Sequence, residues 1–242
     1  MFVLFTDFGW QGPYVGQLKA ALQQELPGTP VVDLLHDAPA MDPRAAAYLL
    51  EPFARTLPAG SVTVAVVDPG VGTQRPGCAL EADGRWFVGP VNGLFEFVVR
   101  RASDWAAWAL PPAGERAAPT FHGRDVFAPA AVSLMRDDRR VLGEILEDRP
   151  GAEWPDDVPR VLFVDGYGNA MTGIRGSVVS DGAIVEAGGK RFVGARTFGD
   201  VTPGHPFWYR NSSGLVEIAV SGDSAAAVLD LVPGSRVRLI RP

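Results

Sequence analysis

The order of strand-like and helix-like segments in the first two thirds of the chain is the feature that most constrains its fold. Short apolar runs at residues 2–6, 31–35 and 61–67 alternate with helix-like stretches at about residues 14–25 and 43–53. Because this order predicts strand–helix–strand–helix–strand, we expect a mostly parallel sheet that is covered by helices. One further strand and two further helices continue the pattern at residues 86–89, 93–101 and 126–135.

The pattern of expected strands and helices changes after residues 147–159. This segment is rich in proline, glycine and acidic residues, which is typical of a linker. Beyond it, short strand-like runs are separated by glycine and aspartate turns, and only residues 224–229 favour a helix. The runs are residues 161–164, 184–186, 191–193, 215–220 and 236–240. Strands at this spacing predict a small antiparallel barrel or sandwich. We therefore expect an α/β domain over residues 1–148 and a small β-domain over residues 159–242.

The composition excludes several classes of partner and cofactor. With 22 basic and 28 acidic residues, the net charge is −6, which disfavours nucleic acid and anionic membrane surfaces. One cysteine cannot form a disulfide framework, and three histidines leave little for a zinc site. No apolar run approaches the roughly 20 residues of a membrane span, and the first residues lack the pattern of a signal peptide. We expect a cytoplasmic protein without a metal or cofactor.

Two aspartates follow expected parallel strands, where ligands bind in open α/β sheets. Asp7 follows the first strand, and Asp68 follows the third in a Pro-Gly turn. Aspartate and Pro-Gly also make ordinary turns, but two such acids at equivalent positions favour a site, and a carboxylate suits a ribose diol. The turn after the first strand lacks a Gly-x-Gly-x-x-Gly fingerprint, and no Gly-x-x-x-x-Gly-Lys-Ser/Thr loop occurs. A nucleoside ligand without phosphates stays a possibility, whereas an enzyme that uses NAD or ATP is disfavoured.

The densest polar cluster, residues 120–125, directly precedes an expected helix. Here we expect Asp125 to cap the helix and Arg124 to pair with an acid. His122 lies beside a glycine in a loop, where an imidazole is usually solvated or functional. The other two histidines, His36 and His205, have no such context and are expected to be structural or superficial.

Two polar segments of the second domain are candidate binding loops, although each is more commonly a simple turn. They are residues 165–169 and 211–220. The amide of Asn169 matches the donor–acceptor pair of an adenine edge. Phe198 and residues 208–209 could form an aromatic stacking surface, although packing is the commoner use of such side chains.

Six motifs occur in the order found in the S-adenosylmethionine hydrolases, or hydroxide adenosyltransferases, which are relatives of the fluorinase and chlorinase enzymes. They are residues 6–9, 67–73 with Arg75, 89–94, 120–125, 165–169 and 211–220. The chain resembles this family over nearly its whole length. The resemblance implies an α/β domain followed by a small antiparallel β-barrel. It also implies a homotrimer, in which each ligand lies between the N-terminal domain of one subunit and the C-terminal domain of its neighbour.

The implied reaction is hydrolysis of S-adenosylmethionine to adenosine and methionine, by attack of water or hydroxide at the ribose C5′. By resemblance, Asp68, Arg75 and His122 hold the nucleophile, and Asp7 binds the ribose diol. The remaining family positions hold the nucleoside or the methionine, and they are Asp165, Asn169, Phe198, Ser212, Glu217 and Val220.

Asp68 also bears on the choice of nucleophile, because halide-using relatives carry a non-acidic residue there and a carboxylate would repel a halide. Two positions depart from the family pattern: Gly12 and Val91 stand where an acid is usual. Two alternatives remain open at this point. One is a nucleoside-binding module without turnover, and the other is a halide-using adenosyl transferase.

Overall fold

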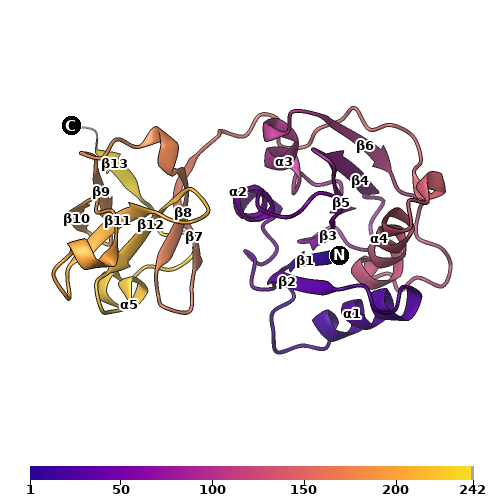
Figure 1. Cartoon of the computed structure of the whole chain (residues 1–242), viewed down its shortest axis with the longest axis horizontal. Coiled ribbons are helices and arrows are strands. Elements are labelled where there is room, and N and C mark those ends of the chain that lie inside the picture. Colours follow the sequence, from indigo (N-terminus) through magenta and orange to yellow (C-terminus); the bar gives the residue numbers. More distant parts are fainter. Residues whose placement is uncertain (241–242) are drawn as a thin grey trace. The chain divides into compact units, whose positions relative to one another are not determined.

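The computed structural model describes residues 1–240, which form two compact units: an N-terminal unit, Met1–Glu153, and a C-terminal unit that begins at Trp154 (Figure 1). The linker-like composition of residues 147–159 coincides with the change from one unit to the other. Among residues 1–240, no helix combines the length and the apolar character needed to span a bilayer.

The N-terminal unit contains a six-stranded sheet in the order β2-β1-β3-β5-β4-β6. Its strands are β1 (Phe2–Thr6), β2 (Val31–Leu35), β3 (Val62–Val66), β4 (Gly77–Ala82), β5 (Arg85–Pro90) and β6 (Trp105–Ala109). The first four strands in this order are parallel, and β4 runs antiparallel to both of its neighbours. The mostly parallel α/β sheet predicted from the sequence is thus confirmed.

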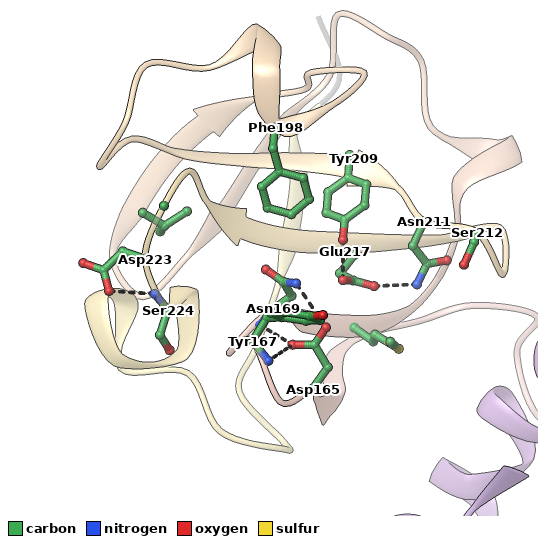
Figure 2. A pocket seen from close by; sticks show the side chains of 13 residues that line it. Asp165, Tyr167, Asn169, Phe198, Tyr209, Asn211, Ser212, Glu217, Asp223 and Ser224 are labelled. Carbon is green, nitrogen blue, oxygen red and sulfur yellow. Dashed lines mark hydrogen bonds between the residues drawn. The ribbon is translucent and has the colours of Figure 1, made fainter.

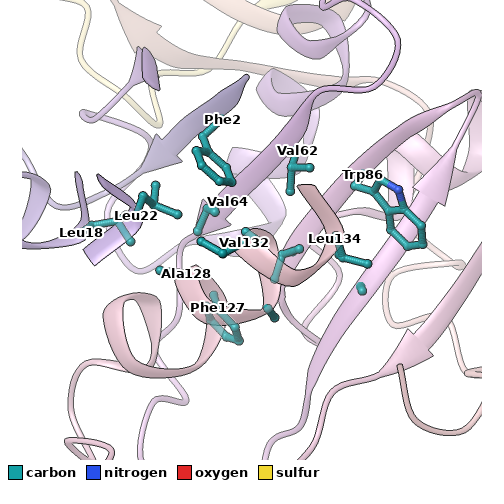
Figure 3. Close-up of a cluster of buried hydrophobic side chains, with 14 of the residues drawn as sticks. Phe2, Leu18, Leu22, Val62, Val64, Trp86, Phe127, Ala128, Val132 and Leu134 are labelled. Atoms are coloured by element: carbon teal, nitrogen blue, oxygen red, sulfur yellow. The ribbon is translucent and has the colours of Figure 1, made fainter. Parts of the chain in front are cut away.

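Helices cover this sheet and bury its central strands. They are α1 (Tyr14–Glu25), α2 (Pro43–Ala54), α3 (Glu96–Arg101) and α4 (Ala128–Met135), with a π-helical turn η1 (Gly123–Phe127) before α4 and a 3-10 turn η2 (Arg139–Val141) after it. Every residue of β1 and β3 is buried, as expected for strands covered on both faces. Figure 3 shows Phe2 and Val64 of these strands packed with Leu18 of α1 and Val132 of α4.

The C-terminal unit contains two antiparallel sheets, in the orders β11-β12-β8-β7 and β10-β9-β13. The strands are β7 (Val158–Val164), β8 (Ala170–Arg175), β9 (Ile184–Ala187), β10 (Lys190–Val193), β11 (Pro206–Arg210), β12 (Leu215–Val220) and β13 (Arg238–Ile240). The helical segments are α5 (Ala225–Leu229), η3 (Gly176–Val178) and η4 (Phe198–Asp200).

The antiparallel architecture of this unit is as predicted, and within residues 1–240 continuous strand pairing around a closed barrel is not detected. Isolated bridges join the edges of the two sheets, Arg160 with Arg236 at one pair of edges and Gly194 with Trp208 at the other, and further backbone hydrogen bonds lie beside these bridges. No ladder within the described residues closes them further. The sheets enclose a common core that includes Val185, Trp208 and Ile218.

Candidate active site

The register of the parallel sheet brings Asp7 and Asp68 to the same edge. β1 and β3 are adjacent, with Thr6 opposite Val66. The backbone N–H of Asp7 then donates to the Val66 carbonyl at 3.2 Å, and Asp68 lies two residues beyond Val66. The nearby Asp68 charge is one of the factors that raise the pKa of Asp7, although burial is the largest. Two carboxylates therefore share the carboxyl end of the sheet.

Asp68 and Arg75 form a buried ion pair at this edge. A terminal guanidinium nitrogen (Nη2) of Arg75 lies 2.5 Å from Asp68 Oδ2, and the two side chains are 11% and 2% exposed. The other carboxylate oxygen accepts from the N–H of Gly70 at 3.2 Å, which fixes the carboxylate within its own turn. Arg75 also donates to the carbonyl of Pro76. Its buried Nε has no hydrogen-bond partner among the described residues.

Asn92 supports the turn that carries Asp68. Its amide nitrogen donates to the Val67 carbonyl at 2.9 Å, and its amide oxygen accepts from the N–H of Leu94 at 3.2 Å. The close approach of β5 to β3 depends on Gly89 in β5, because a Cβ there would lie 2.2 Å from the carbonyl oxygen of Ala65 in β3. The sequence analysis includes Asn92 in a family motif but gives it no function. Only the register of β3 and β5 reveals its contact.

Replacement of Asn92 by alanine should lower kcat without raising KM, because the Val67 peptide would lose the bond that sets its orientation beside Asp68. The carbonyl of the completely buried Val67 would also lose this donor, which should lower the free energy of unfolding by about 1–3 kcal/mol. Turnover measured well below the melting transition, together with urea unfolding, would test both effects. A rise in KM with kcat unchanged would contradict this position-setting function.

His122 lies at the N-terminus of η1, close to the same strand end. A Cβ on the adjacent Gly123 would lie 3.3 Å from Phe8 and 3.5 Å from Val66, so this loop packs on the ends of β1 and β3. The Asp68 turn also contacts the segment before His122, since a Cβ on Gly72 would lie 2.8 Å from the Pro119 carbonyl oxygen. The structure thus gathers Asp7, Asp68, Arg75 and the His122 loop at one edge.

The neighbouring pair, Arg124 and Asp125, corrects one expectation. Arg124 pairs with an acid as expected, and the acid is Asp125 itself, at 2.6 Å. However, Asp125 does not cap the following helix. Its other carboxylate oxygen accepts from the upstream N–H of Ala118 at 2.8 Å, because the chain enters η1 already in a helical conformation and leaves no cap position for this side chain.

All six residues expected to contribute from the second domain line one pocket of about 760 Å³ in the C-terminal unit (Figure 2). They are Asp165, Asn169, Phe198, Ser212, Glu217 and Val220. Asp165 organises its entrance turn by accepting from the N–H groups of Tyr167 and Asn169 at 2.9 and 2.8 Å and from the Asn169 amide at 3.1 Å. The charged side chains of the lining are all carboxylates.

Glu217 is buried on the floor of this pocket and is held by two partners. Tyr209 Oη donates to one carboxylate oxygen at 2.5 Å, and the Asn211 amide donates to the other at 2.6 Å. Burial is the main cause that raises the pKa of Glu217, and the charge of Asp165 adds to it. Burial and the contact with Glu217 raise the pKa of Tyr209 as well. The pairing of Asn211 with Glu217 is not predictable from the sequence pattern alone.

The aromatic side chains of the second unit divide between the pocket and the core. Phe198 and Tyr209 lie at the pocket with an edge-to-face contact at 5.4 Å. The ring of Trp208 points the other way, is 2% exposed, and donates from its indole nitrogen to the Ala183 carbonyl. Trp208 is therefore a core residue and no part of a stacking surface, because neighbouring residues of β11 alternate in direction.

The two units carry the two domains of one family. The model of the S-adenosylmethionine (SAM) hydroxide adenosyltransferase N-terminal domain matches residues 2–141, and that of the C-terminal domain matches residues 159–238. The chain belongs to the SAM hydroxide adenosyltransferase family. This membership confirms the resemblance on which the sequence analysis relied.

Several relatives are similar over almost the whole chain. The (R)-S-adenosyl-L-methionine hydrolase of Thermus thermophilus is 43% identical, with 97% of each chain covered. That of Salinispora arenicola is 36% identical, over 97% of this chain and 95% of the relative. Among solved structures, an uncharacterized conserved protein from Thermotoga maritima has a TM-score of 0.88 at 28% identity, with both chains covered completely. A conserved hypothetical protein from Thermus thermophilus has a TM-score of 0.75 at 40% identity, with 99% of both chains covered.

Proposed function

We propose that the chain hydrolyses S-adenosylmethionine to adenosine and methionine, and that Asp68, Arg75 and His122 activate the attacking water. Family membership and the curated hydrolase relatives support the activity. The observation that carries the residue assignment is the buried Asp68–Arg75 pair at the carboxyl edge of the sheet, with the His122 loop packed beside it. Across the described residues, no three histidine, cysteine, aspartate or glutamate side chains gather to hold a metal ion.

The chemistry of the substrate makes the nucleophile the difficult part of the reaction. The sulfonium leaves C5′ as a neutral thioether and therefore needs no general acid. Water is a poor nucleophile because its pKa is about 15.7. Asp68 is the acceptor oriented by Arg75, and His122 shares the protons of the water. Arg75 stays protonated, so it stabilises developing hydroxide character and does not act as the base.

Asp7 is the proposed ligand of the ribose diol. Its Oδ2 accepts from the N–H of Met41 at 2.9 Å, which orients the carboxylate at the sheet edge. An ionised carboxylate only accepts hydrogen bonds, and the two ribose hydroxyls supply donors.

The raised pKa of Asp7 predicts a pH dependence of nucleoside binding. Burial and the charge of Asp68 favour the protonated form, so Asp7 loses its charge at a higher pH than an ordinary aspartate. On acidification, the affinity for adenosine should therefore fall before an exposed aspartate would titrate. Calorimetric titration with adenosine across the acidic range measures this fall. Asp7→Asn should flatten it and Asp68→Asn should not; a profile that Asp7→Asn leaves unchanged would refute the assignment.

The pocket of the C-terminal unit is the proposed site for the rest of the substrate. Asn169 has the donor and acceptor that an adenine edge requires, and the exposed face of Phe198 offers a stacking surface. The acidic lining suits a ligand that carries an ammonium and a sulfonium. Ser212, Glu217 and Val220 complete the contacts to adenine and methionine.

We further propose that the protein is a homotrimer whose ligand is shared between subunits, and that it is cytoplasmic. The trimer is testable by complementation. Asp68→Asn disables the N-terminal site, and Phe198→Ala removes a ring from the pocket of the C-terminal unit. If one subunit supplies Asp68 and its neighbour supplies Phe198, refolding the two variants together should restore part of the activity. Mixtures no more active than the separate variants, or a monomer in sedimentation experiments, would count against it.

Product analysis decides between hydrolysis and the two alternatives. The purified protein is incubated with each sulfonium epimer of S-adenosylmethionine, with and without chloride and a chelator. Adenosine and methionine in equal amounts are expected, with turnover insensitive to the chelator. A 5′-chloro-adenosine would identify a halide-using transferase, and bound substrate without product would identify a binding module. The name of the relatives makes the R epimer the expected substrate.

A further inference from the structure

A chain of three side chains lies beneath the Asp7 turn and takes no part in the mechanism above. His36 is completely buried between two polar partners. Its Nδ1 lies 2.8 Å from the hydroxyl of Thr6, and its Nε2 lies 3.0 Å from Oδ1 of Asp33. Thr6 is also completely buried, so its hydroxyl cannot reach a substrate. The sequence predicts a structural or superficial histidine here, and the structure places His36 in a polar network beside the candidate site.

With a neutral imidazole, the three side chains have one consistent hydrogen-bond direction. Asp33 is also bonded to Lys19 at 2.9 Å; although burial raises its pKa, these hydrogen bonds lower it below the ordinary value, so the carboxylate accepts. In its neutral form, His36 donates from Nε2 to this carboxylate and presents Nδ1 as an acceptor. Thr6 donates its hydroxyl proton to Nδ1, which leaves the hydroxyl oxygen free to accept.

The hydroxyl oxygen of Thr6 also accepts a hydrogen bond, which lies within the Asp7 turn. It accepts from the N–H of Phe8 at 3.3 Å and so spans Asp7. The backbone of His36 supports the same turn from its other end, because its carbonyl accepts from the N–H of Gly9 at 2.8 Å. Gly9 adopts a φ of +69°, which favours glycine and makes the turn tight. Both ends of the Asp7 turn are thus tied to His36.

We propose that the Thr6–His36–Asp33 chain fixes the conformation of the Asp7 turn, which makes His36 a positioning residue for the carboxylate that binds the ribose. The inference rests on the proposed function of Asp7. Asp68 and Arg75 belong to another turn and are untouched by the chain. Loss of the Thr6–His36–Asp33 hydrogen bonds should consequently weaken nucleoside binding and leave the chemical step almost unchanged.

The test compares two identical substitutions in neighbouring strands. Thr6→Val removes the hydroxyl that joins His36 to Phe8. Thr63→Val makes the same change at a completely buried hydroxyl of β3 that has no hydrogen-bond partner among residues 1–240. Thr6→Val should raise the Kd of adenosine and the KM of S-adenosylmethionine by roughly tenfold, the scale of one hydrogen bond, with kcat within about twofold. Thr63→Val should leave all three values unchanged, and Thr6→Ser should restore them.

A double variant shows whether the chain acts through Asp7. If it does, Thr6→Val should cost nothing further in an Asp7→Ala background, whereas independent effects would multiply. His36→Gln should match Thr6→Val, with circular dichroism verifying the fold. Wild-type adenosine affinity in Thr6→Val, or the same loss in Thr63→Val, would overturn this inference alone. Wild-type affinity in Asp7→Ala would overturn it together with the ribose assignment.

Discussion

Replacement of Asp68 by asparagine should slow the hydrolysis of S-adenosylmethionine by about 10²–10⁴-fold, the usual contribution of a general base. Asparagine has the volume of aspartate, and its amide oxygen can still accept from Gly70 or Arg75. It cannot take a proton from water at neutral pH. KM should change little, because the proposed mechanism places Asp68 at the nucleophile and not at the nucleoside. Chromatographic measurement of adenosine release gives both constants.

Asp157→Asn provides the matched control for this experiment. Asp157 also forms a carboxylate–arginine pair, with Arg175 at 2.6 Å, but it belongs to the C-terminal unit and does not line the pocket that contains Glu217. The control variant should keep the wild-type kcat. His122→Ala should resemble Asp68→Asn if both groups handle the protons of the water. Wild-type turnover in Asp68→Asn and His122→Ala would remove both residues from the mechanism.

The elements that were predictable from the sequence are those whose pattern is independent of distant neighbours. The apolar runs of β1 and β2 and the helix α1 have the predicted bounds. The antiparallel strands β4 and β6 escaped prediction because they are rich in alanine and carry little β-branched character. They are strands because β5 and its neighbours offer them an edge to pair with, and the local sequence does not contain that information.

The same limit applies to the C-terminal unit. β8 was missed because Gly173 interrupts it; the glycine is required there, since a Cβ would lie 2.2 Å from Val158 Cγ1 on the adjacent strand. β11 was missed because it begins with Pro206, and proline is tolerated at the start of an edge strand. Both features depend on which strand lies next to which.

The candidate site also has residues whose placement is predictable from the strand order and contacts that are not. Asp7 and Asp68 could be placed together because the strand order alone brings the ends of β1 and β3 to one edge. The contacts of Asn92 with Val67 and of His36 with Thr6 could not be predicted. They join residues 25 and 30 positions apart, and they depend on register and on side-chain direction.

Replacement of Phe127 by alanine should lower the free energy of unfolding of the N-terminal unit by about 3–5 kcal/mol, a large share of the 5–15 kcal/mol typical of a whole protein. The ring is 1% exposed at the end of η1 and lies in the core cluster of Figure 3. It packs against Gly77 at the start of β4, where an added Cβ would lie 2.8 Å from the ring. Urea unfolding measures the loss.

This substitution should also disturb the position of Arg75 in the candidate active site, because the guanidinium of Arg75 lies 5.7 Å from the centroid of the Phe127 ring. Phe97→Ala is the matched control: its ring is completely buried in the same unit and lies 4.8 Å from the guanidinium of Arg100, which is outside the candidate site. Both variants should lose similar stability. At a temperature where both are folded, only Phe127→Ala should lose kcat, since only its cavity lets Arg75 leave Asp68. Equal kcat values in the two folded variants would show that the core does not set the position of Arg75.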